Sequence, residues 1–96
     1  MAIIIVNDLA PDVTADEYAR VSEIVQAQGD PDGLVFHTGF MNGDHIQVVD
    51  AWESREQFDA FRESTLVPAV MQVMGDRMDG PPPEPAQHEP LDLQTR

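Results

Sequence analysis

Two titratable side chains, His37 and Asp50, lie in apolar, strand-like segments on either side of Asn42-Gly43. Asn-Gly is the strongest short hairpin signal, because both central positions of a type I′ turn need positive φ. A hairpin would bring the imidazole and the carboxylate to one face of a sheet, beside Trp52. A partly desolvated histidine held in one tautomer by a carboxylate is typical of a general base. The alternative interpretation is a structural contact in which two polar groups of a sheet satisfy each other.

The register of this hairpin decides how closely the two groups approach. If Asn42 and Gly43 form a two-residue loop, His37 lies opposite Val48 and Asp50 is its diagonal neighbour, roughly 7–8 Å away between backbones. An imidazole and a carboxylate can meet across such a diagonal, directly or through water. The predicted face of His37 also carries Val35, Gly39, Ile46, Val48, Asp50 and Trp52; the other face carries Phe36, Thr38, Phe40, His45, Gln47, Val49 and Ala51.

Further candidates for ligand contact lie outside the hairpin or at its end. Asn7 ends the first predicted strand, where an amide either caps a turn or contacts a ligand. Aromatic residues and methionines follow the hairpin at helical spacing, and they either fill a core or form the walls of an apolar pocket. The predicted substrate-binding residues are Trp52, Phe58, Phe61, Met71, Met74 and His88.

Several classes of site find no support in the sequence. The histidines, at positions 37, 45 and 88, include no close-spaced pair, and the chain has no cysteine, so no metal site is expected. No glycine-rich phosphate loop opens a helix, and no Gly-x-Ser-x-Gly elbow occurs. We therefore expect neither a nucleotide cofactor nor serine hydrolysis.

Charge and composition limit the partners. The net charge of −13 comes from 18 acidic and 5 basic residues, which disfavours binding to nucleic acid or to a membrane surface. The charge serves solubility, with steering of a cationic ligand as the alternative. The longest early apolar run, AIIIV, is far too short for a membrane span and lacks the basic flank of a signal peptide. Together with the absence of cysteine, this favours a cytoplasmic location.

The surrounding elements are predicted from periodicity and capping. A β-branched strand over residues 2–7 is followed by a helix from Ala15, with Thr14 and Glu17 as its capping box and Tyr18 in its apolar stripe. After the hairpin, a second helix begins at Ser54 and is kinked or restarted at Pro68. A proline-rich connector then leads to an edge strand.

The order β-α-β-β-α-β predicts an α+β, ferredoxin-like protomer with a four-stranded antiparallel sheet and two helices on one face. We assign residues 1–80 to this domain and residues 81–96 to the connector and the C-terminal edge strand or tail. One chain has nothing left to cover the second sheet face, so we expect a homodimer in which two sheets pack face to face.

The segments IIIVND, GLVFHTG, VVDAWESREQFDAFRE and LVPAV resemble the antibiotic biosynthesis monooxygenase-like family of dimeric α/β barrels. The resemblance covers about residues 2–75. It implies a ferredoxin-like protomer, a homodimer and an apolar pocket between sheet and helices. Family members that oxidise aromatic polyketides are similar in using no flavin, metal or haem. In those members an asparagine on the first strand and a tryptophan position the substrate, and Asn7 and Trp52 are the matching residues.

The haem-degrading branch of the family also resembles this chain. That branch needs a tryptophan on the second helix and, further along, a histidine that ligates iron. Here these positions hold Phe61 and Met71, so haem degradation is not expected.

Three functional hypotheses follow. The first is a cofactor-independent monooxygenase for a small aromatic, polyketide-like molecule, with His37, Asp50 and Asn7 as its catalytic residues. The second is a cyclase or isomerase that uses the same base without oxygen. The third is a non-catalytic, small-ligand-binding dimer whose pocket is only a core.

Overall fold

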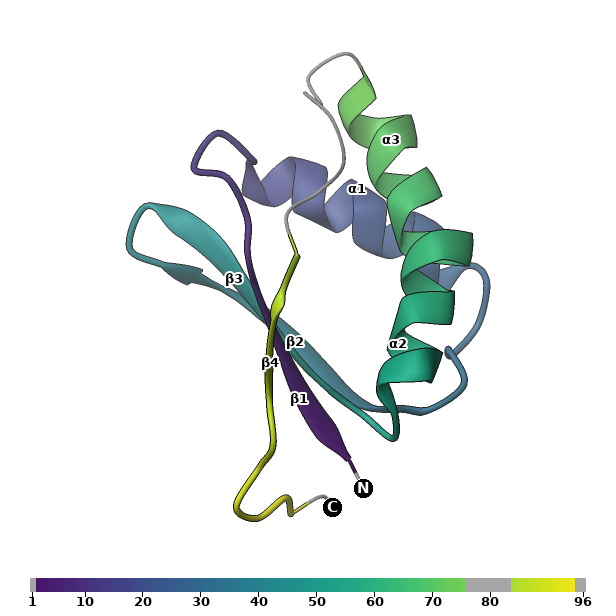
Figure 1. The fold of residues 1–96 in the computed structure, drawn as a ribbon. Coiled ribbons are helices and arrows are strands. Elements are labelled where there is room, and N and C mark those ends of the chain that lie inside the picture. The colour runs from purple at the N-terminus through teal and green to yellow at the C-terminus, as the bar shows by residue number, and fades with distance from the viewer. Residues whose placement is uncertain (1, 76–83, 95–96) are drawn as a thin grey trace.

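A computed structural model describes residues 2–75 and 84–94. Its elements are β1 (Ile3–Asp8), α1 (Ala15–Gln26), β2 (Leu34–Asn42), β3 (His45–Trp52), α2 (Arg55–Phe61), the π-helix η1 (Arg62–Leu66), α3 (Val67–Met74) and β4 (Ala86–His88). The strands form one antiparallel sheet in the order β2-β3-β1-β4, and the helices all lie on one side of it (Figure 1). The α+β, ferredoxin-like protomer predicted from the sequence is confirmed.

Side-chain caps fix where the helices begin. Thr14 Oγ1 accepts a hydrogen bond from the Glu17 amide at 3.1 Å, and a Glu17 carboxylate oxygen accepts one from the Thr14 amide at 3.0 Å. At α2 the Ser54 hydroxyl accepts a hydrogen bond from the Gln57 amide at 3.2 Å. These bonds satisfy amides that have no partner within the first turn, so both helices begin where the sequence predicts.

Pro68 accounts for the break in the second helical segment. Proline has no N–H and its ring clashes with the carbonyl four residues earlier, so a regular α-helix cannot continue through it. The chain instead widens into η1 before Pro68 and resumes as α3, with Pro68 in the first turn. The predicted interruption is confirmed.

The β2–β3 hairpin turns at Gly43–Asp44, which corrects the predicted loop. Asn42 pairs with His45, and Gly43 has φ of +67° while no described non-glycine residue has positive φ. Positive φ at the first central position alone is the pattern of a type II′ turn. His37 therefore lies directly opposite Asp50, not diagonal to it as predicted. The register differs by two positions, so each paired side chain stays on its predicted face.

A β-bulge at the start of β2 changes one further assignment. Leu34 pairs with Trp52 and Phe36 with Ala51, so Val35 is an extra residue in the ladder. Leu34, and not Val35 as predicted, packs against the core on the helix-facing side. Val35 is 36% exposed.

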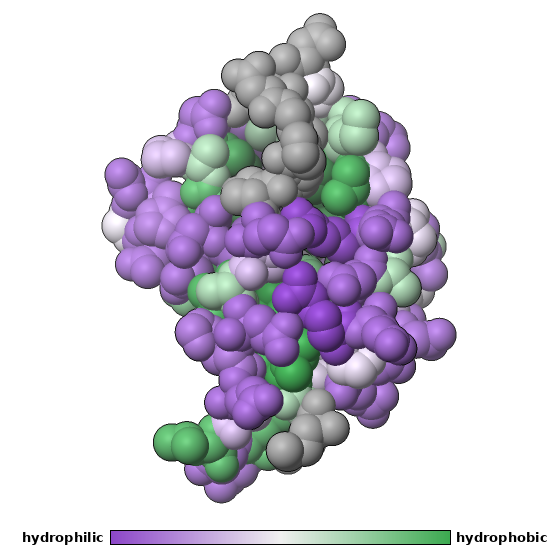
Figure 2. Space-filling view, in the orientation of Figure 1, coloured by the Kyte–Doolittle hydropathy of each residue, from purple (hydrophilic) through white to green (hydrophobic). Residues whose placement is uncertain are grey.

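The core lies between the sheet and the helices. Ile3, Ile5, Trp52 and Phe58 form its buried cluster. Strand alternation sends the neighbouring residues to the opposite face, which no helix among the described residues covers. We call this the open sheet face; it carries Ile4, Val6, Phe36, Thr38, Phe40, Val49 and Ala51. Hydrophilic residues cover most of the side of the molecule seen in Figure 2, with apolar patches between them.

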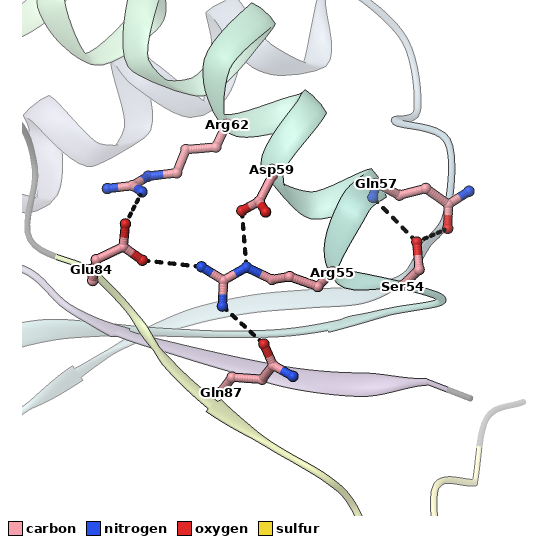
Figure 3. A network of polar contacts seen from close by, with 7 residues as sticks. All are labelled: Ser54, Arg55, Gln57, Asp59, Arg62, Glu84 and Gln87. Atoms are coloured by element: carbon pink, nitrogen blue, oxygen red, sulfur yellow. Dashed lines mark hydrogen bonds and ion pairs between the residues drawn. The ribbon is translucent and has the colours of Figure 1, made fainter.

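β4 pairs with β1 at the sheet edge, where an edge strand was expected. Arg55 ties this segment to α2, because its guanidinium contacts Glu84 at 3.0 Å and Gln87 at 2.9 Å (Figure 3). Arg62 contacts the other oxygen of Glu84 at 3.1 Å. Most of the predicted proline-rich connector, residues 79–83, lies outside the described residues. Within residues 2–75 and 84–94 no helix is long and apolar enough to cross a membrane.

Candidate functional site

A histidine–carboxylate pair lies between β2 and β3 on the helix-facing side of the sheet. His37 Nδ1 is 2.6 Å from Asp50 Oδ1, and Trp52 Nε1–H donates a hydrogen bond to Asp50 Oδ2 at 3.2 Å. Both carboxylate oxygens are therefore occupied as acceptors, and the His37 Nδ1 must carry the hydrogen in that contact. This fixes the tautomer of neutral His37 with an unprotonated Nε2.

Burial differs between the two members of this pair. The Asp50 side chain is 11% exposed, whereas the His37 side chain is 40% exposed and can be reached from solvent. The hydrogen bond with Asp50 raises the pKa of His37 above its ordinary value; partial burial lowers it, and the negative charge of Asp50 raises it further. The carboxylate thus orients the imidazole and makes it a stronger base.

Tyr18 of α1 completes a three-residue chain that the sequence did not predict. Its hydroxyl is 2.9 Å from His37 Nε2, the nitrogen left unprotonated by the contact with Asp50, so the hydroxyl donates. The two rings are nearly parallel, at 18°, with centroids 6.5 Å apart, and the hydrogen bond rather than face-to-face contact joins them. Burial raises the pKa of the Tyr18 phenol, and the negative charge of Asp50 adds to the rise, so Tyr18 is a neutral phenol.

Gly39 provides the space for the Tyr18 hydroxyl. A Cβ at position 39 would collide with that oxygen and with the ring carbon that bears it. The glycine is therefore required by this close approach, not by its backbone angle. A tyrosine on the apolar stripe of a helix, with a glycine two residues from a histidine on the facing strand, is the signal that sequence reasoning missed.

Asn7 of β1 lies on the same side of the sheet as the pair, displaced by two residues along the strands. It pairs with Val48 on β3, so Asp50 is its diagonal neighbour at roughly 7–8 Å between backbones. The Asn7 side chain is half-buried, and its amide has no hydrogen-bond partner among the residues that the structure describes.

The aromatic candidates fill the space beneath the helices. Trp52 is 1% and Phe58 is 3% exposed, and their rings meet edge to face at 5.7 Å between centroids. Phe61 is half-buried and packs on Trp52, at 5.1 Å between centroids. Trp52 therefore acts on the site through its hydrogen bond to Asp50, and it has almost no surface to offer to a ligand.

The other sequence candidates lie on α3 and β4. Met71 is 57% exposed and Met74 is half-buried on α3. His88 of β4 pairs with Ile4, which places it on the open sheet face. His88 is therefore on the opposite side of the sheet from His37, and Met71 offers its side chain mainly to solvent.

The two best-formed surface hollows in the described part of the chain include neither His37 nor Asn7. The larger, of about 540 Å³, lies between residues 30–32 and the helices α2 and η1, with Phe61 in its wall. The smaller, of about 90 Å³, is lined by Ala2, Ile3, Glu89 and Pro90. Neither hollow encloses His37, whose partly exposed imidazole can be reached directly from solvent.

A second histidine–carboxylate cluster lies at the far end of the hairpin. His45 Nε2 is 3.0 Å from Asp8 and Nδ1 is 3.1 Å from Asp44. Hydrogen bonds with these carboxylates raise the pKa of His45. Its ring is not in any of the ring contacts found among the described residues, and no group of three candidate ligands in those residues can hold a metal ion.

Neither a protein-family model nor a curated protein sequence matches the chain. Several solved structures do match over nearly its whole length. Rv0793 from Mycobacterium tuberculosis has a TM-score of 0.62 at 18% identity, with 98% of this chain and 97% of that chain covered. A candidate antibiotic biosynthesis monooxygenase from Chloroflexus aurantiacus has a TM-score of 0.60 at 15% identity, covering 98% and 95%.

The haem degrader MhuD from M. tuberculosis, whose structure holds two haems in its active site, has a TM-score of 0.52 at 19% identity, covering 98% and 100%. These likenesses agree with the resemblance noted in the sequence. At such low identities they establish the fold.

Proposed function

We propose that the protein is a small, cofactor-independent monooxygenase in which His37, held by Asp50, receives a proton from an aromatic, phenolic or enolic substrate. The observation that carries this proposal is the 2.6 Å contact between His37 Nδ1 and Asp50 Oδ1, in a pair whose imidazole is 40% exposed. Similarity of fold to a candidate antibiotic biosynthesis monooxygenase supports the same class of reaction.

The proposed chemistry uses dioxygen as its only oxidant. Loss of the proton leaves an electron-rich anion, which dioxygen attacks at an activated ring carbon. For an anthrone-type CH₂ group, one oxygen atom becomes the new carbonyl, and the other leaves as water with the two hydrogens of that carbon. The protein's part is to hold the proton on His37, to stabilise the imidazolium with Asp50 and to fix the substrate oxygen.

We propose that Asn7 binds the substrate at the end opposite to the group that faces His37. Its side-chain amide has no partner among the described residues and faces the same side of the sheet as His37. The two residues are separated by β3 across the sheet and by two residues along it, which puts their backbones roughly 12 Å apart. That span suits a polycyclic aromatic molecule such as a polyketide product.

We also infer that a second copy of the chain covers the open sheet face. That face carries several apolar side chains, and Phe40 is 44% exposed there. A chain of 96 residues buries a limited share of its own surface, so association adds core that one copy lacks.

A non-catalytic, ligand-binding dimer is the second candidate. It is favoured by the burial of Trp52 and Phe58, which fill the space where an enclosed pocket was expected. A cyclase or isomerase using the same base is the third, and it differs in consuming no oxygen. Haem degradation is not proposed, because Phe61 and the exposed Met71 occupy the positions at which the haem-degrading branch needs a tryptophan and an iron-ligating histidine.

Oxygen uptake with a panel of hydroxyanthrone- and dihydroquinone-type substrates tests the proposal. We expect wild-type turnover with the product mass of an oxygenated quinone, and a loss of roughly 10²–10⁴-fold in kcat for His37→Ala. His45→Ala is the matched control and should keep full activity, since His45 is also paired with carboxylates but lies at the far end of the hairpin. Equal activity of His37→Ala and wild type would refute the proposal, and a cyclised product without oxygen uptake would favour the cyclase.

A further inference from the structure

We propose that the Tyr18 hydroxyl is the group that contacts the substrate oxygen and relays its proton to His37 Nε2. This rests on the proposed role of His37 as the base. It makes Tyr18 a catalytic residue, and it names an acidic hydroxyl as the substrate group that the site recognises.

His37 has no free acceptor to offer to a substrate. Its Nδ1 is engaged with Asp50 at 2.6 Å, and the single lone pair of Nε2 is engaged with Tyr18 at 2.9 Å. A substrate proton can therefore reach the imidazole without displacing any described side chain only through the phenol oxygen. That oxygen keeps a free lone pair while it donates to Nε2.

The position of the Tyr18 hydroxyl depends on a glycine of the facing strand. Gly39 leaves space for it where any Cβ would collide. The same glycine lies on the ladder row of Asn7, since Gly39 and Asn7 both pair with Val48. The phenol oxygen thus lies over the row of paired residues Gly39, Val48 and Asn7. Asn7, at the other end of that row, is the proposed second contact of the substrate.

The proton balance is complete within these groups. The substrate O–H proton passes to the Tyr18 oxygen as the Tyr18 proton passes to Nε2, so Tyr18 is regenerated as a neutral phenol. The products of the step are a substrate oxyanion, which accepts a hydrogen bond from Tyr18, and an imidazolium between Tyr18 and Asp50. Burial and the charge of Asp50 raise the pKa of Tyr18, which prevents it from holding the negative charge itself.

The test uses 4-nitrophenol, whose phenolate is followed by its visible absorbance, and it needs no turnover. Below the pH at which the free probe ionises, wild-type protein should increase the phenolate absorbance on binding. Tyr18→Phe should weaken phenolate binding roughly tenfold to a hundredfold, because it removes a hydrogen bond to a charged oxygen. Gly39→Ala should have the same effect, because the new Cβ displaces the hydroxyl while the phenol remains in the chain.

Thr38→Ala is the matched control, because Thr38 lies between His37 and Gly39 on β2 but points to the open sheet face. It should behave as wild type. Unchanged phenolate binding in Tyr18→Phe, or no ionisation of the probe by wild-type protein, overturns the relay. Ionisation that depends on Tyr18, without oxygen uptake from any substrate, leaves the relay standing and refutes only the monooxygenase proposal.

Discussion

His37 and Asp50 are direct partners in the β2–β3 ladder, and their side chains meet at 2.6 Å between Nδ1 and Oδ1. The two side chains differ in burial, because the Asp50 carboxylate is almost fully buried whereas the His37 imidazole is partly exposed to solvent. Because Trp52 holds the second carboxylate oxygen, Asp50 cannot rotate away without leaving a buried donor unpaired. The orientation of Asp50 is therefore fixed, and the carboxylate in turn controls the orientation and the pKa of His37.

The first prediction concerns the titration of His37. We expect a pKa above the ordinary 6.5 in the wild type, and a clear decrease in Asp50→Asn, where the carboxylate charge is gone and burial still lowers the pKa. Two-dimensional NMR of the imidazole resonances measures both values. Asp44→Asn is the control: it should lower the pKa of His45 and leave that of His37 unchanged. Overlapping His37 titration curves in wild type and Asp50→Asn would contradict the prediction.

The second prediction is the pH dependence of stability. The pKa of His37 is higher in the folded chain than in the unfolded chain, so folding favours its protonated form. The resulting stabilisation is fully present below the unfolded pKa of about 6.5 and is lost as the pH rises through the raised folded pKa. Urea unfolding of wild type and His37→Gln across this range should show the largest difference at the acidic end. A difference that grows toward alkaline pH would show that the sign is wrong.

The third prediction separates the two roles of Trp52. Trp52→Phe removes the Nε1–H donor to Asp50 and leaves a small cavity in the core, which should cost about 2–4 kcal/mol of unfolding free energy. It should also change the His37 titration, because Asp50 is freed on one side. Phe58→Leu is the control: it removes part of the same core but no hydrogen bond, so it should destabilise the chain and leave the His37 pKa as it is. Urea midpoints and NMR titrations of both variants decide the question.

The sequence predicts much of this site because its local signals are strong. Thr14 and Ser54 set the helix starts by accepting hydrogen bonds from nearby backbone amides, and Pro68 interrupts the helix because it has no N–H to donate. Each of these effects depends on few neighbours. Alternation along the hairpin placed His37, Asp50 and Trp52 on one face, and a register difference of two positions preserves that face.

The interpretation failed where geometry depends on contacts distant in the chain. Asn-Gly predicts a type I′ loop, but Asn42 keeps an extended backbone and donates to Gln47 at 3.3 Å, so the turn moves on by one residue. The contact of Tyr18 with His37 spans two elements, and it depends on a packing angle that no local pattern encodes. Burial of Trp52 likewise follows from how α2 lies on the sheet.

The last prediction concerns the open sheet face and the proposed dimer. Phe40 and Met71 are both exposed large apolar side chains, at 44% and 57%, but Phe40 lies on the open sheet face and Met71 on α3. If a second copy covers the sheet, Phe40→Asp buries an unpaired charge in the interface and should shift the chain toward monomer. Met71→Asp adds the same charge on the helical side and should leave the mass unchanged. Sedimentation equilibrium over a concentration series measures both. A wild-type monomer at all concentrations, or equal dissociation of the two variants, would show that no second copy covers the open sheet face.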